Sequence, residues 1–265
     1  MDGDALDLER LNDHEARNRA EWNRVAPEWV AAAERHWDPA TEPHWGIWHV
    51  PEASVGALAP VGDLAGRDVV ELGCGTAYWS AWLARRGARP VGVDLSEGQL
   101  ATAREMQERH SLAFPLVHAS AERVPLPDAS FDLALSEYGA SLWCDPHAWI
   151  PEAARLLRPG GWLVFLTGSV LAALTAPEEG PLGEALVRSM DEIRRIAWDV
   201  DPSIEFHLPH GEMLALLGSG GFTDVALREV YAPEDGRDPG EVAHYATRGW
   251  SRRWPVEEIW VARRV

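Results

Sequence analysis

Residues 68–94 read DVVELGCGTAYWSAWLARRGARPVGVD, and this stretch decides the fold. It contains an apolar run, a turn with two glycines, a segment of helical periodicity and a second apolar run that ends at Asp94. Further short apolar runs follow at 115–120, 131–137 and 162–169, with helical patterns between them. Strands that alternate with helices at this spacing predict a parallel sheet with helices on both faces, which is the doubly wound α/β class.

The segment before this core is less regular. A helix is expected around residues 13–35, followed by a loop at 33–52 that is rich in Trp, His and Pro. We interpret this loop as a candidate lid. Together these residues predict an N-terminal helical cap over 1–60.

The main domain is expected to span 61–265. Residues 170–209 interrupt its alternation and predict a helical insert, so we place a substrate lid at 170–210. A short amphipathic helix follows, and then two final strands at 223–231 and 257–265, of which the last is expected to be antiparallel.

The charge balance argues against polyanionic partners. The chain has 265 residues, with 24 basic and 42 acidic side chains and a formal net charge of −18. Such a surface repels the phosphates of nucleic acids and of anionic membranes. All 24 basic residues are arginine, and the absence of lysine excludes Schiff-base and pyridoxal-phosphate chemistry and the usual phosphate-loop lysine. We expect neither a nucleic acid nor a membrane as a partner.

The cysteines and the N-terminus bear on location. Cys74 and Cys144 are too few for a disulfide framework, and neither belongs to a cluster with metal-ligand spacing. The N-terminal residues are acidic and polar, and no later stretch approaches about eighteen apolar residues, which argues against a signal peptide and a membrane span. We therefore expect a cytoplasmic protein without a metal site. A monomer and a homodimer both remain open.

The glycine turn predicts the kind of ligand. Gly73 and Gly75 lie between a strand and a helix, where the backbone can approach a ligand closely and free helix amides attract an anion. The dinucleotide fingerprint requires glycine at position 78, where this chain has Tyr78, and this disfavours NAD and FAD. Asp94 ends the next strand, where a carboxylate can accept both hydroxyls of a ribose. Glycine turn and acid together predict a nucleoside site.

Four motifs extend this prediction to a family: ELGCGTA at 71–77, VGVDLS at 91–96, ASAERVPLPDASFD at 119–132 and RLLRPGGWLVF at 155–165. They resemble the motifs of the class I S-adenosylmethionine-dependent methyltransferases, specifically the bacterial group that acts on small molecules. The resemblance covers about residues 65–170. It implies a Rossmann-like sheet of seven strands, S-adenosylmethionine as cofactor and S-adenosylhomocysteine as its product.

The resemblance also implies roles for individual residues. Glu71 would hold the ammonium group of the cofactor, and Asp94 its ribose. The chain departs from the family at Ala77, where the first motif usually ends in glycine, and at Ser120, where an aspartate often bonds the adenine. The implied cofactor-binding residues are Glu71, Gly73, Cys74, Gly75, Asp94, Leu95, Gln99, Ser120, Ala121, Glu122 and Ser136.

Methyl transfer depends mainly on the alignment of nucleophile, methyl and sulfur, and it needs a base only when the nucleophile carries a proton. Residues 136–147 follow the strand that faces the methyl group in this fold. Glu137 and Tyr138 are therefore the catalytic candidates, with packing and backbone bonding as their alternative roles. Three isolated histidines are weaker candidates, because such residues are usually structural: His147, His207 and His210.

Tryptophan is unusually frequent, with 14 residues in the chain. Many lie near the two ends, and ends that meet over the sheet would form an aromatic cap for a planar or cationic acceptor. Packing of irregular segments is the alternative. The tryptophans near the ends are Trp22, Trp29, Trp37, Trp45 and Trp48, and Trp250, Trp254 and Trp260.

We therefore predict an S-adenosylmethionine-dependent methyltransferase, a transferase that methylates oxygen, nitrogen or carbon of a small organic acceptor in a Trp-rich pocket. An aromatic compound or an amine is the favoured acceptor. Two alternatives remain: a protein that binds S-adenosylmethionine without turnover, and a nicotinamide-dependent oxidoreductase, against which Tyr78 argues.

Overall fold

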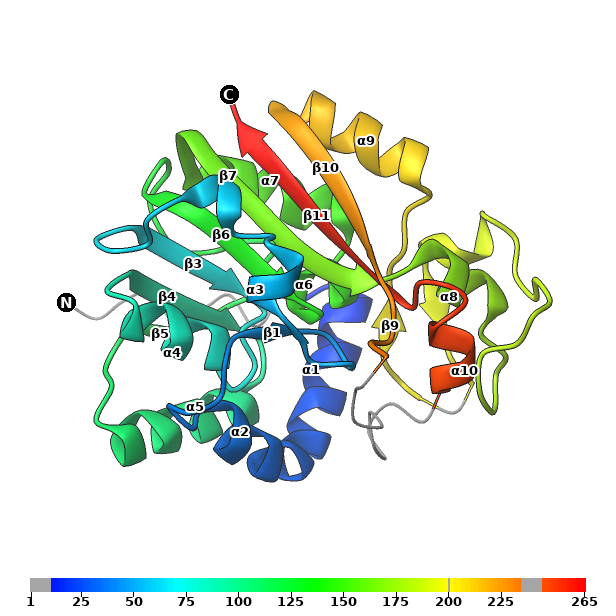
Figure 1. Cartoon of the computed structure of the whole chain (residues 1–265), viewed down its shortest axis with the longest axis horizontal. Helices are drawn as coiled ribbons and strands as arrows, with labels where there is room; N and C mark the ends of the chain where they lie inside the picture. Colours follow the sequence, from blue (N-terminus) through cyan, green and yellow to red (C-terminus); the bar gives the residue numbers. More distant parts are fainter. Residues whose placement is uncertain (1–10, 200, 235–244) are drawn as a thin grey trace.

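The computed structural model describes residues 11–199, 201–234 and 245–265, which fold around a central sheet (Figure 1). In the described residues this sheet has seven strands in the order β10-β11-β7-β6-β3-β4-β5. Neighbours from β5 to β7 pair in parallel, and β11 lies antiparallel between β7 and β10. The predicted mostly parallel sheet with a reversed last strand is confirmed. The strands are β3 (Asp68–Leu72), β4 (Arg89–Asp94), β5 (Leu116–His118), β6 (Phe131–Glu137), β7 (Leu157–Gly168), β10 (Phe222–Val230) and β11 (Glu257–Arg264).

Helices connect and cover these strands. Side-chain caps mark the start of several helices: for example, Ser96 accepts from the Gln99 amide before α5, and Asp145 accepts from the His147 amide before α7. None of the helices in the described ranges is both long enough and apolar enough to cross a membrane. The helices are α1 (Asp13–Val25), α2 (Val30–His36), α3 (Glu52–Val55), α4 (Tyr78–Arg85), α5 (Glu97–His110), α6 (Gly139–Trp143), α7 (Pro146–Leu156), α8 (Val170–Thr175), α9 (His210–Ser219) and α10 (Arg248–Ser251).

Alternate residues of the central strands face opposite layers. In β7, Leu163 and Phe165 join a core with α7 and α9, whereas Val164 and Leu166 join a core with α4. Strands that are buried on both faces read as continuous apolar runs, which is why the sequence marks them clearly. The sheet then presents the carboxyl ends of its parallel strands at one edge.

The N-terminal helix is present but interrupted. A 3₁₀ turn at Ala26–Trp29 separates α1 from α2, because Pro27 cannot donate a backbone hydrogen bond. Both helices lie beside α5 (Figure 1). Asn18 of α1 donates to the carbonyls of Trp143 and Ile204 at 2.9 and 3.0 Å, which ties this helix to the main domain.

The candidate lid contains a small ladder in place of a plain loop. β1 (His44–Trp45) pairs antiparallel with β2 (Val50–Pro51). Before this ladder, the fully buried Trp37 donates from Nε1 to the Thr76 carbonyl at 2.8 Å. The lid segment is therefore fixed directly to the glycine turn.

The prediction of a helical insert at 170–209 was wrong. Besides α8, the segment contains a 3₁₀ turn at Glu192–Arg194 and a ladder of β8 (Ile196–Ala197) with β9 (Ile204–Glu205), and much of the rest is irregular. Proline and glycine residues at 177–183 break the apparently helical pattern. In Figure 1 the insert, which includes α8, lies beside α10, on the side away from α2 and α5.

β7 begins earlier than the sequence predicts. The strand includes residues 157–161, which precede the apolar run at 162–169, and the pairing with β6 shifts register between Phe131 and Leu133. Gly160 has φ +86°, so this irregularity uses the conformational freedom of glycine.

Candidate functional site

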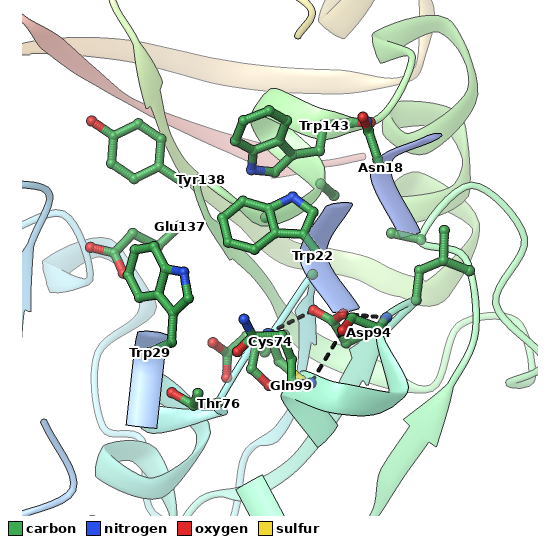
Figure 2. A pocket seen from close by; sticks show the side chains of 18 of the residues that line it. Asn18, Trp22, Trp29, Cys74, Thr76, Asp94, Gln99, Glu137, Tyr138 and Trp143 are labelled. Carbon is green, nitrogen blue, oxygen red and sulfur yellow. Dashed lines mark hydrogen bonds between the residues drawn. The ribbon is translucent and has the colours of Figure 1, made fainter. Parts of the chain in front are cut away.

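A cavity lies at the carboxyl ends of β3, β4 and β6 (Figure 2). Both catalytic candidates, Glu137 and Tyr138, line it. Most of the predicted cofactor-binding residues line it too: Glu71, Gly73, Cys74, Gly75, Asp94, Leu95, Gln99, Ser120 and Ala121. These residues come from separate strand ends, so the parallel sheet brings together groups that are distant in the sequence.

The glycine turn requires its glycines. Gly73 and Gly75 have φ of +70° and +53°. A Cβ on Gly73 would lie 2.5 Å from the amide nitrogen of Ala140 and 2.5 Å from Cα of Gly139, so the turn contacts the segment after β6 backbone to backbone. Ala77 has φ +58°, a conformation that costs about 1–2 kcal/mol for a residue with a Cβ.

Asp94 ends β4 with both carboxylate oxygens bonded to the backbone. Its Oδ2 accepts from the Gly75 amide and its Oδ1 from the Ser96 amide, each at 2.7 Å. Burial raises the pKa of Asp94, against the effect of these bonds. The carboxyl group is thus fixed at the cavity wall, where a ribose can bond to it.

Glu71 is buried beneath the turn. Its Oε2 accepts from the Ser80 amide at 2.8 Å and from the Ser80 hydroxyl at 2.6 Å. Burial, with a smaller contribution from the charge of Asp94, raises the pKa of Glu71 to about 8. The empty site therefore favours the protonated acid at pH 7, and a cation placed beside it would favour the carboxylate.

Ser120 and Ala121 lie at another part of this wall, next to Glu15 of α1. The Ser120 hydroxyl donates to Oε1 of Glu15 at 2.5 Å, and Arg123 pairs with the same carboxylate at 3.1 Å. Sequence reasoning missed Glu15. The sequence around Glu15 does contain a pattern, because Asn12 and Glu15 form a capping box at the start of α1. A capping box predicts where a helix begins, and it does not predict a binding site.

Two predicted cofactor residues do not line the cavity. The carboxylate of Glu122 bonds to the Asp145 amide at 2.8 Å and to His14 at 2.7 Å. The hydroxyl of the fully buried Ser136 donates to the Leu72 carbonyl at 2.8 Å. Both contacts join neighbouring segments, so their cofactor-binding role stays a prediction that the geometry does not support.

The catalytic candidates are bonded to other parts of the fold. Glu137 accepts from the Gly46 amide at 2.7 Å, and burial raises the pKa of Glu137 well above its usual value. The Tyr138 hydroxyl donates to Glu257 at 2.5 Å. Burial and the charge of Glu257 raise the pKa of Tyr138 well above its usual value, so the phenol keeps its proton. Glu257 begins β11, is buried with a pKa of about 7, and was not predicted because nothing local marks it.

Three tryptophans line the cavity, but they do not come from both chain ends. Trp22 and Trp29 belong to the N-terminal segment, and Trp143 ends α6. The ring centroid of Trp22 lies 5.7 Å from that of Trp29 and 5.2 Å from that of Trp143. Trp250 and Trp254 pack in a separate core together with Trp48, so the two ends of the chain meet there and not among the residues that line the cavity. A role of this contact as a cap for the acceptor stays a prediction.

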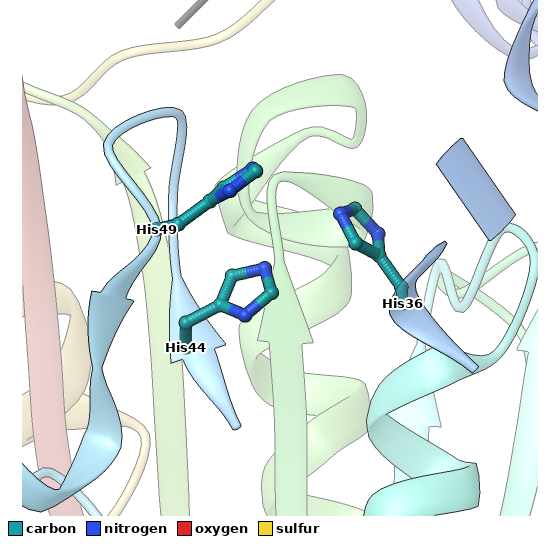
Figure 3. A group of neighbouring side chains, drawn as sticks. All are labelled: His36, His44 and His49. Atoms are coloured by element: carbon teal, nitrogen blue, oxygen red, sulfur yellow. The ribbon is translucent and has the colours of Figure 1, made fainter. Parts of the chain in front are cut away.

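His36, His44 and His49 form a cluster beside the cavity, and His36 and His49 line it (Figure 3). Burial, with a smaller effect of the neighbouring histidines, lowers the pKa of His36 to about 3 and that of His44 to about 4. Both rings are therefore neutral at pH 7. The sequence prediction included no metal site, because these spacings match no helical period and the ladder that joins two of the residues was expected to be a loop.

The other candidate histidines lie outside the residues that line the cavity. His207 pairs with Glu205 at 3.1 Å, and His210 pairs with Glu258 at 2.8 Å. With His147, which lies exposed near the start of α7, they are best explained as structural or surface residues.

Comparison with known proteins agrees with this geometry. A family model described as a methyltransferase domain matches residues 70–165. A malonyl-[acyl-carrier protein] O-methyltransferase from Serratia marcescens is 38% identical over 116 residues, which are 43% of this chain and 42% of that protein. A solved S-adenosylmethionine dependent methyltransferase from Mesorhizobium loti has a TM-score of 0.62 at 24% identity, over 83% of this chain and 100% of that one. Residues 70–165 are thus a methyltransferase domain, similar to those of the class I S-adenosylmethionine-dependent methyltransferases.

The chain spans about half the length of the curated relatives it matches. A third comparison extends over nearly the whole chain. A 1,6-didemethyltoxoflavin-N1-methyltransferase from Burkholderia thailandensis, solved with 1,6-didemethyltoxoflavin and S-adenosylhomocysteine bound, shares the fold with a TM-score of 0.56 at 18% identity, over 97% of this chain and 92% of that one. S-adenosylmethionine is thus the cofactor of the family, and the strand-end groups of this chain fit it.

Proposed function

We propose that this chain transfers a methyl group from S-adenosylmethionine to a small organic acceptor that is aromatic or carries an amine. The observation that carries the proposal is the continuity of the cavity: one wall carries the family's cofactor motifs, and the other carries Trp22, Trp29 and Trp143 (Figure 2). The relatives named above include an O-methyltransferase and an N-methyltransferase, so we leave the acceptor atom open.

The chain's own residues bind and align the reactants. When bound, S-adenosylmethionine supplies an electrophilic methyl group on a sulfonium sulfur. We assign Asp94 to the ribose and Glu71 to the ammonium group, with Gly73 and Gly75 beneath the methionine part. Alignment and exclusion of water can supply on the order of 7–11 kcal/mol in well-oriented reactions, so this chemistry does not require a strong base.

Where the acceptor carries a proton, Glu137 is the group we assign to orient or remove it. Its carboxyl group lines the cavity, and burial raises the pKa of Glu137, which increases its affinity for a proton. Tyr138 has a different role, because its proton is donated to Glu257 and its own pKa is raised. We assign Tyr138 to shaping the acceptor wall.

The acceptor class follows from the aromatic wall and the charge. The three indole rings contact one another at centroid distances of 5–6 Å and so form a continuous aromatic surface. A flat ring can pack edge-on against such a surface, and a cation is attracted to the ring faces. The net charge of −18 also favours the approach of a cationic acceptor over an anionic one.

A labelling experiment tests the proposal. The protein is incubated with methyl-labelled S-adenosylmethionine and a panel of phenols, aromatic acids and amines, and both S-adenosylhomocysteine and labelled product are measured. We expect transfer to at least one acceptor, and much slower transfer with the Asp94→Ala variant when the cofactor is below saturation. Binding of S-adenosylmethionine without transfer to any member would favour the non-catalytic alternative, and binding of NAD alone would favour the oxidoreductase.

A further inference from the structure

The histidine cluster is not used by the proposed methyl transfer. His36 ends α2, His44 lies in β1 and His49 lies in the turn before β2, and Figure 3 shows the three rings turned toward a common space. One nitrogen from each ring lies within 4.8 Å of the other two. Tetrahedral zinc with nitrogen ligands keeps them about 3.3 Å apart, so small side-chain rotations would complete the geometry.

His44 is prepared to act as a ligand. Its Nδ1 lies 3.0 Å from the Glu42 carbonyl oxygen, and a carbonyl can only accept, so Nδ1 carries the proton. Nε2 therefore presents its lone pair, and this buried atom has no hydrogen-bond partner in the part of the chain that the structure describes. An imidazole that donates to a carbonyl from one nitrogen and leaves the other unpaired is the arrangement of metal-bound histidines.

The turn that carries His49 has a strained backbone, and this strain brings the His49 ring close to the ring of His44. His49 has φ +49°, a region that residues other than glycine rarely adopt. This conformation places its ring 4.3 Å from that of His44, measured between centroids. The carboxylates of Glu137 and Glu257 accept from amides of the same turn at 2.7 Å and fix it. Strain that is fixed by surrounding bonds is typical of functional sites.

We propose that His36, His44 and His49 bind a divalent transition-metal ion, for which zinc is the best match. Nitrogen ligands suit zinc and its neighbours, whereas magnesium and calcium prefer oxygen. Three protein ligands leave a fourth position open. Because His36 and His49 line the cavity, this position faces the space assigned to the acceptor, where the ion can bind an oxygen, nitrogen or sulfur atom of that molecule. This last step rests on the proposed function, but the metal site does not.

Cobalt(II) replaces zinc in such sites and reports tetrahedral coordination through its visible absorption bands. We expect the metal-free protein to bind one equivalent of Co²⁺ with these bands, and added Zn²⁺ to displace it, while Mg²⁺ does not. His49→Ala removes an exposed ligand with little risk to folding and should weaken Co²⁺ binding by about 100-fold or more. His44→Gln should have the same effect. His147→Ala, which changes an exposed histidine outside the cluster, should have none.

The remaining outcomes are also decisive. Absent visible bands, or bands that persist in both His49→Ala and His44→Gln, would overturn the metal site. Azide added to the cobalt form should change the spectrum if the fourth position is open, and an unchanged spectrum would overturn its role toward the acceptor. Because S-adenosylhomocysteine binding is measured separately by calorimetry, failure of the metal site and failure of the proposed function are distinguishable.

Discussion

The two walls of the cavity are built in different ways. The cofactor wall consists of strand ends, and its groups bond to the backbone, as Asp94 does to the amides of Gly75 and Ser96. The acceptor wall comes mainly from α1, α2, the β1–β2 turn and α6, and its side chains contact one another through rings, as Trp22 does Trp143. The sheet thus provides the chemistry that the family shares, and the added segments provide what distinguishes this member.

The largest effect on stability and on cofactor binding should come from adding one methyl group at Gly73, in the strand-end wall that we assign to the cofactor. Gly73→Ala imposes φ +70° on alanine and places its Cβ 2.5 Å from neighbouring backbone atoms. We expect a loss of about 3 kcal/mol in the free energy of unfolding, together with loss of cofactor binding. Thermal unfolding and calorimetric titration with S-adenosylhomocysteine measure both. The control is Gly218→Ala in α9, where a Cβ meets nothing within 4 Å; an equal loss there would contradict a strict requirement at the turn.

Asp94→Ala should have the next largest effect, because it removes the predicted ribose ligand and two bonds that shape the wall. We expect the affinity for S-adenosylhomocysteine to fall by about 10- to 100-fold, or about 1–3 kcal/mol, with little change in the thermal midpoint of the empty protein. Asp132→Ala is the matched control, since Asp132 also accepts from a backbone amide, that of Asp68, but lies at the opposite edge of the sheet. Equal affinity in the two variants would show that the ribose lies elsewhere.

A substitution in the aromatic wall that we assign to the acceptor should change the binding of the acceptor and leave the binding of the cofactor unchanged. Trp22→Ala removes the central indole of the three, and we expect KM for the acceptor to rise by about tenfold, in line with about 1 kcal/mol for an aromatic contact. The affinity for S-adenosylhomocysteine should stay unchanged. Trp254→Ala, which changes a tryptophan outside the cavity, is the control for loss of an indole. If Trp22→Ala lowered the affinity for the cofactor and left KM for the acceptor intact, the two walls would not be separate.

A pH dependence follows from Glu71. Its pKa of about 8 in the empty protein lies above its unfolded value, so the stability it contributes is complete below pH 4.5 and is lost as pH rises through 8. An ammonium group bound beside it favours the carboxylate, so binding should release a proton. Between pH 6 and 8, affinity for S-adenosylhomocysteine should therefore rise by about 50-fold. Titrations in buffers of different ionisation enthalpy measure the proton, and Glu71→Gln should release none.

The smallest effect concerns Ala77. Glycine tolerates the φ of +58° that alanine adopts there, so Ala77→Gly should raise the free energy of unfolding by about 0.5–1 kcal/mol. Denaturant unfolding measures the change. Ala81→Gly, within α4 and not at positive φ, should instead be destabilising, and a loss of stability in both variants would show that the turn is not strained.

The sequence predicted the sheet, and it singled out most of the strand-end residues that line the cavity, because both depend on local patterns. Buried parallel strands are continuous apolar runs, and the glycine turn and Asp94 are defined within one strand–helix–strand unit. The positions of Glu15, Glu257 and the three clustered histidines depend on how distant segments pack, and no local periodicity encodes that. The insert at 170–209 was mistaken for helix because its apolar residues are spaced like a helix, while its prolines and glycines dominate the outcome.

The bond from Trp37 to the Thr76 carbonyl joins the two walls at one point. Trp37 directly follows His36, so a rearrangement of the turn on cofactor binding would be passed to α2, in parallel with the bonds that join Glu15 to Ser120 and Asn23 to Ser96. Thermodynamic reciprocity then requires that the factor by which cofactor improves acceptor affinity equals the factor by which acceptor improves cofactor affinity. We expect this coupling to appear as an equal gain in the affinity for each ligand when the other one is saturating.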